Sequence, residues 1–136
     1  YDGSSWVEVG NQDSAATDAQ TISFNYTAPG GGFGGVETVN LANISPGARI
    51  VDVSVEVTTA LGNYTGATEP TVDVGTAADL DQFMTGEESD LSSAGTYTAN
   101  PNYLYPATQS VDLSLKARIS HRSATQGDFV VTVTYV

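Results

Sequence analysis

The sequence predicts an all-β domain, an antiparallel β-sandwich or jelly roll of about eight strands with at most one short helical turn. Three observations lead to this prediction. Apolar and polar residues alternate with a period of two in several segments, which is the pattern of half-buried strands. Clusters of Gly, Pro and Asn separate these segments. The hydrophobic residues, 40% of the chain, are mainly Val, Ala and Tyr, which is typical of β proteins.

The N-terminal third is predicted to hold two strands and an arm. Residues 5–9 are expected to form a short strand within residues 1–19, which we interpret as an extended N-terminal arm. Gln20–Thr27 has an apolar residue at every second position and is predicted to be a half-buried strand. The glycine-rich loop 29–35, which includes Phe33, is expected to become ordered most easily against another surface.

The middle of the chain contains the best predicted core strand, residues 49–58, between weaker strands at 36–43 and 71–75. One face of this core strand is lined by alternating valines: Val51, Val53, Val55 and Val57. Residues 77–84 are predicted to form the helical turn, with Thr76 as its cap.

The C-terminal part is predicted to end in a long hairpin. Tyr97 begins a short strand, and the tyrosine-rich segment 100–106 is expected to be a loop because prolines bound it. The strands 109–120 and 128–136 are expected to pair through a turn at 121–127. The inward residues of the first of these strands are expected to be Val111, Leu113, Leu115, Ala117 and Ile119. The centre of the core is predicted to be Val53, Val55, Leu113, Leu115, Val131 and Val133.

Length and charge limit the classes of function. The 136 residues fit one domain. Sixteen acidic and four basic residues give a net charge of −12, which disfavours nucleic acid and anionic membranes as partners. The same acidic surface also suits a protein from salty water. Cysteine is absent, so stability must come from packing, sheet pairing and assembly.

The chain lacks the pattern of a catalytic or metal site, and we predict neither enzymatic activity nor a cofactor. His121 is the single histidine, which excludes a multi-histidine metal site within one chain. We interpret it as a turn or interface residue. The carboxylates of residues 79–90 could bind Ca²⁺, but their spacing does not match an EF-hand loop. We therefore interpret them as a solvated acidic loop.

Aromatic residues are the candidate contact sites. Tyrosine and tryptophan are enriched at protein interfaces, and their rings also stack on sugars. The candidates for an interface or a glycan contact are Trp6, Phe33, Tyr64, Tyr103 and Tyr105. Tyr103 and Tyr105 flank a leucine between two prolines, and this segment is predicted to be the best exposed patch. Packing against a neighbouring subunit is favoured over glycan binding.

One ordered set of segments resembles a known family. It comprises the Val-rich strand at 50–57, the sequence Pro-Thr-Val-Asp-Val-Gly-Thr-Ala-Ala-Asp from Pro70 to Asp79, Asp90-Leu91 with Ala94-Gly95-Thr96-Tyr97, and two long closing strands. Over residues 48–136 this order resembles small β-sandwich virion proteins of tailed bacteriophages. The resemblance implies a viral setting and a scaffold, but no active-site residues.

These observations predict a non-enzymatic virion structural protein, exposed on the particle surface, that decorates or stabilises a capsid through subunit contacts. The expected partners are further copies of the chain, with a trimer favoured, and the major capsid protein or another virion protein. Two alternatives remain at this stage. One is a tail-fibre or baseplate module that binds carbohydrate or a receptor. The other is an extracellular filament subunit whose N-terminal segment fills a groove of its neighbour.

Overall fold

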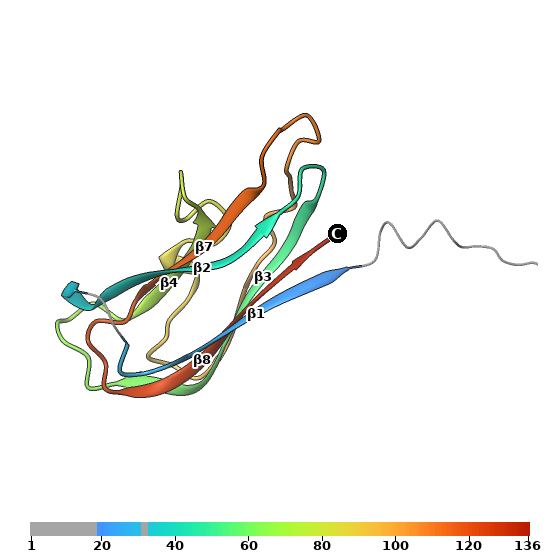
Figure 1. The fold of residues 1–136 in the computed structure, drawn as a ribbon. Helices are drawn as coiled ribbons and strands as arrows, with labels where there is room; N and C mark the ends of the chain where they lie inside the picture. Colours follow the sequence, from blue (N-terminus) through green and yellow to red (C-terminus); the bar gives the residue numbers. More distant parts are fainter. Residues whose placement is uncertain (1–18, 31–32) are drawn as a thin grey trace, which may run out of the picture.

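Two antiparallel sheets face each other across a single apolar core (Figure 1). The computed structural model describes residues 19–30 and 33–136. The strands are β1 (Gln20–Thr27), β2 (Val36–Ile44), β3 (Arg49–Gly62), β4 (Thr71–Thr76), β5 (Gly95–Ala99), β6 (Tyr103–Leu104), β7 (Leu113–Ser120) and β8 (Gln126–Tyr135). Two short 3₁₀ turns, η2 (Phe33–Gly35) and η3 (Gly86–Glu88), lie between strands.

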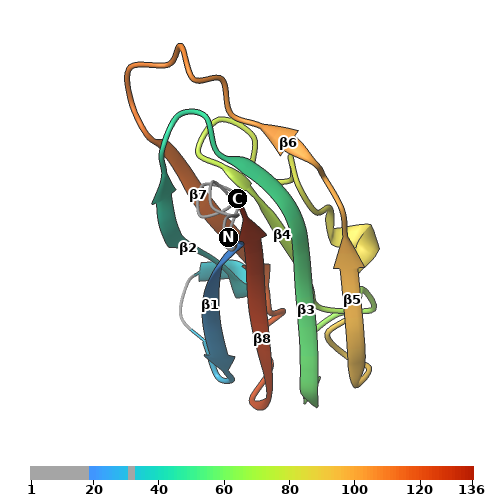
Figure 2. The same ribbon diagram turned by 90° about the vertical axis from the view of Figure 1, so that its right-hand side faces the viewer.

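The strand order is that of a jelly roll, which decides between the two predicted architectures. The first sheet has the order β1-β8-β3-β5, with β6 also paired to β3, and the second has the order β2-β7-β4. Figure 2 shows the strands of the first sheet side by side in this order. From β1 to β4 the chain changes sheet at every connection, and it does so again from β7 to β8. This alternation between two sheets is the jelly-roll arrangement.

The core forms where the alternating strands face each other. Along β3 and β8, Val53, Val55 and Val57 lie opposite Val133, Val131 and Phe129, and all six are buried. Leu115 is also fully buried, whereas Leu113 at the start of β7 is half-buried and packs against the core. Five of the six residues predicted as the centre of the core are therefore confirmed, and Leu113 lies at its margin.

Two residues predicted to point inward do not lie in the core. A register shift between Ile50 and Asp52 interrupts the pairing of β3 with β8, so Ile50 is fully buried and Val51 only half-buried. Such a bulge adds a residue to one strand and turns its side chain away. Val111 is 65% exposed because β7 begins only at Leu113.

The predicted C-terminal hairpin is wrong. β7 pairs with β2 and β4, and β8 pairs with β1 and β3. The segment between them therefore crosses from the second sheet to the first. It turns with Arg122 and Ser123 at φ values of 52° and 60°. Two alternating strands with a turn between them look the same in sequence whether they pair or lie in facing sheets.

The helical turn predicted at 77–84 is also wrong. Thr76 Oγ1 does accept a hydrogen bond from the Asp79 amide at 3.2 Å, as a cap would. The chain then returns to β4, where Val74 forms a bridge with Met84. This pairing requires an extended backbone at Met84 and prevents a helix. The short helical segment that follows is η3, and Glu88 Oε1 accepts the Thr85 amide at its start.

The remaining strand predictions differ little from the structure. Gln20–Thr27 has the predicted bounds, and β2, β3, β4 and β5 fall within the predicted segments or extend them. The two-residue strand β6 was not predicted, because a pair of residues carries no period. The predicted strand at 5–9 lies outside the described residues. Among those that are described, no helix is long and apolar enough to cross a membrane.

The core assignment can be tested by substituting neighbouring residues on opposite faces of β3. Val55 is fully buried and Glu56 is exposed. Val55→Asp should destabilise the domain by on the order of several kcal/mol, because it buries an unpaired charge. Glu56→Lys should change the free energy of unfolding little. Thermal unfolding of the two variants checks this, and equal effects would contradict the register of β3.

Candidate functional site

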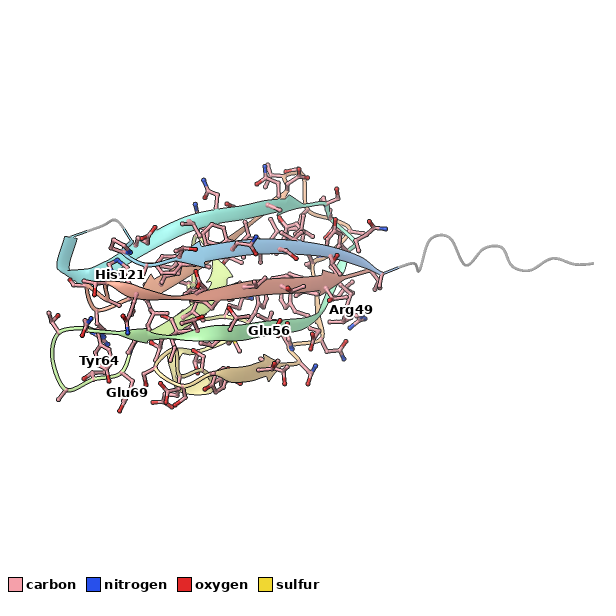
Figure 3. The ribbon with its side chains drawn as sticks, turned by 90° about the horizontal axis from the view of Figure 1, so that it is seen from below. Arg49, Glu56, Tyr64, Glu69 and His121 are labelled. Atoms are coloured by element: carbon pink, nitrogen blue, oxygen red, sulfur yellow. The ribbon has the colours of Figure 1, made fainter. Side chains whose placement is uncertain are left out.

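The sandwich is closed along one side and open along the other. Beside β4 and β5, the connection between these two strands buries Phe83, Met84 and Leu91 against the core. On the opposite side lie β1 and β2, the outer strands of their sheets (Figure 3). Within residues 19–30 and 33–136, β1 pairs only with β8, and β2 pairs only with β7. The open side therefore presents two strand edges.

The edge strand β1 is unusual because it carries no charge in a chain with a net charge of −12. It also contains no proline, and its register with β8 runs from Gln20 to Thr27 without a shift. Soluble proteins usually protect a free edge with charges, prolines or bulges. β2 has two such protections, the charged residue Glu37 and a register shift between Asn40 and Ala42. The edge of β1 has none.

Apolar side chains lie half-buried along this open side. Ile22 and Phe24 of β1 and Val39 and Leu41 of β2 pack against the core without being fully covered. We call these four side chains the apolar stripe. Sequence reasoning identified the two β1 residues as inward-facing, but it could not show that their strand would end at the edge of a sheet.

The outer face of the first sheet is rich in hydroxyl groups. Residues opposite one another across its strands include Thr21 and Thr134, Ser23 and Thr132, and Ser54 and Thr98. The carboxylates on this face are Asp52, Glu56 and Asp128. Asp52 accepts a hydrogen bond from Asn100 Nδ2 at 2.7 Å, and Asp128 accepts one from Thr27 Oγ1 at 2.8 Å. This face is thus polar and mainly acidic, and the one basic residue in the described strands of its sheet is Arg49 at the start of β3.

The outer face of the second sheet holds two of the four basic residues. Arg118 binds Asp73 through two contacts, Nε to Oδ2 at 2.7 Å and a terminal guanidinium nitrogen to the same oxygen at 2.5 Å. Lys116 donates to the side-chain oxygen of Asn40. Both cations are therefore engaged within the domain, and neither forms part of a basic patch for nucleic acid.

His121 is buried at one end of the sandwich and is not available for a surface contact. Its ring is 2% exposed and stacks on Tyr26, which in turn stacks on Phe129. Its Nδ1 accepts the Ser123 amide at 3.1 Å, and its Nε2 lies 3.7 Å from Glu37 Oε1. The predicted turn role is confirmed by the contact with Ser123, whereas its burial contradicts an exposed interface role.

The Tyr26 hydroxyl is buried beside this histidine. Burial, with a smaller contribution from the negative charge of Glu37, raises the pKa of Tyr26 to about 12. The hydroxyl has no hydrogen-bond partner among the described residues. Gly30 passes so close that a Cβ there would lie 1.9 Å from the hydroxyl oxygen. Gly30, near the start of the glycine-rich loop, therefore packs against the protein's own core. The sequence had predicted that this loop would need another surface to become ordered.

The acidic segment forms an open hollow of about 510 Å³ beside β4. Its lining is Thr68, Thr71, Asp81, Thr85, Gly86 and Glu87. A side-chain hydrogen bond with Asp81 raises the pKa of Asp79. No group of three or more His, Asp or Glu side chains within the described part of the chain is placed to hold a metal ion. The arrangement fits solvated carboxylates better than a cation site.

The predicted aromatic patch is largely buried. Tyr105 is 7% exposed and its hydroxyl donates to the Val111 carbonyl at 2.8 Å. Tyr103 packs against Phe83, with ring centroids 5.3 Å apart. The exposed large hydrophobic residue of this segment is Leu104, at 48%. The prediction of an exposed tyrosine pair is therefore wrong for Tyr105, because the hydroxyl reaches a backbone carbonyl six residues ahead.

The other three candidate contact residues lie in different places. Tyr64 is half-buried against the core in the loop after β3 (Figure 3). Phe33 begins η2, and Trp6 lies outside the described residues. The structure therefore does not gather the five candidates into one site. Their contact roles stay predictions.

Comparison with solved structures places the fold among phage capsid components. A chain of the cyanophage Pam1 capsid asymmetric unit matches with a TM-score of 0.60 and 19% identity, over 87% of this chain and 84% of that one. The fold is that of phage capsid proteins. A chain in the acid-stable capsid of Helicobacter pylori bacteriophage KHP30 matches with a TM-score of 0.58 and 20% identity, over 86% of each chain. No family model and no curated protein sequence matches. The predicted resemblance to phage virion proteins is confirmed at the level of the fold.

The environment of Tyr26 makes a prediction about alkaline pH. Because the unfolded phenol ionises near pH 10 and the folded one near pH 12, the unfolded state loses its proton first. The free energy of unfolding should therefore fall as pH rises from 10 to 12. Tyr26→Phe should remove this part of the fall. The measurement is a titration of tyrosinate absorbance in the parent protein and in Tyr26→Phe. The parent should show one ionisation step near pH 12 that the variant lacks. If the step that the variant lacks were instead near pH 10, the hydroxyl would not be buried.

The ion pair between β4 and β7 makes a second prediction. Arg118→Ala would leave the carboxylate of Asp73, which is 9% exposed, without its cation. The expected loss is about 1–3 kcal/mol, the usual penalty for a buried polar group that loses its hydrogen-bond partner. Lys116→Ala is the matched control, since it removes a cation of the same strand whose partner is a neutral amide. Urea unfolding should rank the two variants in this order, and the reverse order would contradict the argument.

Proposed function

We propose that this chain is a non-enzymatic structural protein of a tailed-phage virion that decorates or stabilises the capsid through contacts with other subunits. The observation that carries the proposal is the extent of the structural match. A single jelly roll accounts for 84–86% of the matched capsid chains and for nearly all of the described residues here. A jelly roll of this size is suited to binding on the surface of a shell.

The charge distribution supports a position on the outside of the particle. A net charge of −12 repels packaged nucleic acid. Lys116 and Arg118 are already engaged with Asn40 and Asp73. Arg49 donates to Asn102 Oδ1 at 3.1 Å. An acidic outer surface also keeps particles apart in solution. We therefore infer that the chain faces the medium.

The chemistry of the described residues supports a binding role over a catalytic one. The one histidine is held in a buried turn, and the chain has no cysteine. General acid–base catalysis needs a titratable group within reach of a substrate, and the acidic hollow beside β4 offers carboxylates that face solvent. We propose contacts with further copies, with a trimer favoured, and with the major capsid protein.

The glycan-binding alternative gains no support from the tyrosines. A stacking platform needs exposed ring faces, whereas Tyr105 is buried and Tyr103 packs on Phe83. The filament alternative shares one element with the capsid role, because both need a surface that accepts a neighbouring subunit.

The proposed function can be tested on particles that lack the chain. We expect such particles to assemble, to release their DNA at a lower temperature than complete particles, and to recover when the purified protein is added back. The unfolded variant Val55→Asp should fail to restore them, and Glu56→Lys is its matched control. If the chain were found only in tails, or if its loss left thermal stability unchanged, the capsid role would be wrong.

A further inference from the structure

We propose that the free edge of β1, together with the apolar stripe, is the docking site for residues 5–9 of a neighbouring copy, which add a strand to the first sheet. This inference deepens the proposed function, and it rests on that function for the presence of neighbouring copies. The recognition mode is strand addition, in which backbone hydrogen bonds supply affinity and alternate side chains fill the surface below.

The edge of β1 differs from the other sheet edges of the described structure. β4 is covered where Met84 pairs with Val74. β2 is interrupted by the shift at Asn40, and β5 is only five residues long. β1 offers eight uncharged residues in regular register. Of these edges, it is the one on which a strand can lie with least hindrance.

The apolar stripe supplies the surface for alternate side chains. Ile22 and Phe24 face inward from β1, and Val39 and Leu41 pack against the core from β2, the outer strand of the other sheet. These side chains are only partly covered, so an added strand would bury more of them. Burial of apolar surface contributes roughly 25 cal/mol per Å². The edge therefore offers both hydrogen bonds and apolar area to an occupant.

Residues 5–9 have the complementary pattern. Alternation places Val7 and Val9 on one face of an extended segment and Trp6 and Glu8 on the other. The valine face matches the apolar stripe. Glu8 is the one charged residue of the segment, and β1 has no charged residue. Docking therefore brings no two carboxylates of these two strands together. This is the charge match that a strongly acidic chain requires for contact between copies.

The spacer between this segment and β1 favours a neighbour over the same domain. Residues 10–19 are ten in number, whereas hairpin loops usually have two to five residues. Extended at about 3.3 Å per residue, the spacer reaches roughly 33 Å. That is more than twice the radius of gyration, about 13 Å, of a domain of similar size. The segment can therefore reach the β1 edge of an adjacent subunit.

The absence of cysteine allows a clean cross-linking test on the full chain. Glu8→Cys is placed on the face opposite the valines, and Ser23→Cys is on the outer face of β1, which exposes it to a docked strand. The control is Thr98→Cys, an exposed residue on the outer face of the opposite edge strand β5. Purified single-cysteine variants, one carrying a size tag, are mixed in pairs under mild oxidation.

We expect the Glu8→Cys and Ser23→Cys pair to form mixed dimers at least about tenfold faster than the Glu8→Cys and Thr98→Cys pair, because docking raises the local thiol concentration. Thr21→Cys and Asn25→Cys, on the same face of β1, extend the test to neighbouring registers. Equal rates for β1 and β5 would overturn the inference. So would an intramolecular disulfide in the double variant Glu8→Cys/Ser23→Cys, or faster dimerisation of Ser23→Cys with itself.

A variant in the proposed occupant leaves every described residue unchanged and so complements the cysteine pairs. Val7→Asp/Val9→Asp changes the proposed occupant and none of the core residues that the structure describes, and it should abolish the preference for β1. Retention of that preference would contradict the role of the valines. Normal incorporation into particles without cross-linking contradicts this inference alone. Cross-linking by a protein that is absent from particles contradicts the proposed function alone.

Discussion

The pairing of β3 with β8 is the interaction on which the rest of the structure depends. It places three buried residues of β3 opposite three of β8, with Val55 and Val131 at the centre. β1 and β5 attach to the outer sides of this pair, and the second sheet packs on its inner face. Because side chains alternate with a period of two, a slip of one residue would turn every one of these valines to solvent. The register of one pair thus fixes the position of both faces of the sandwich.

The sequence predicted strands well wherever one face is buried, and poorly wherever position depends on a distant partner. Gln20–Thr27 was predicted with its bounds because its alternation is local. Val51 was misplaced because the bulge exists only relative to β8, and the cap at Thr76 did not lead to a helix because Met84 pairs with Val74. The predicted exposure of Tyr105 was wrong for the same reason, since its hydroxyl donates to the carbonyl of Val111. The uncharged composition of β1 was visible, but its place at an edge was not.

The surface of the domain has acidic faces, a side that is covered by a connecting segment and a strand edge without charge. Carboxylates dominate the outer face of the first sheet and the hollow beside β4, while the cations of β7 are engaged by Asp73 and Asn40. The β4–β5 side is sealed by Phe83, Met84 and Leu91. Contacts between like-charged subunits are least unfavourable where charge is absent. In this domain, the uncharged edge of β1 lies on the open side of the sandwich.

The central place of β7 and β8 also has a consequence for synthesis of the protein. Each sheet has one of the last two strands of this domain as an inner member, and the pairing of Gln20 with Tyr135 joins the first described strand to the last. A ribosome must therefore release the residues up to Ser120 before the second sheet can be completed, and those up to Tyr135 before the first. Pairings of such long sequence separation make folding slow, since a large loop must close first. Until then, Val53 and Val55 remain without their β8 partners, and the nascent chain passes through a period in which its edges and apolar strands are open to aggregation.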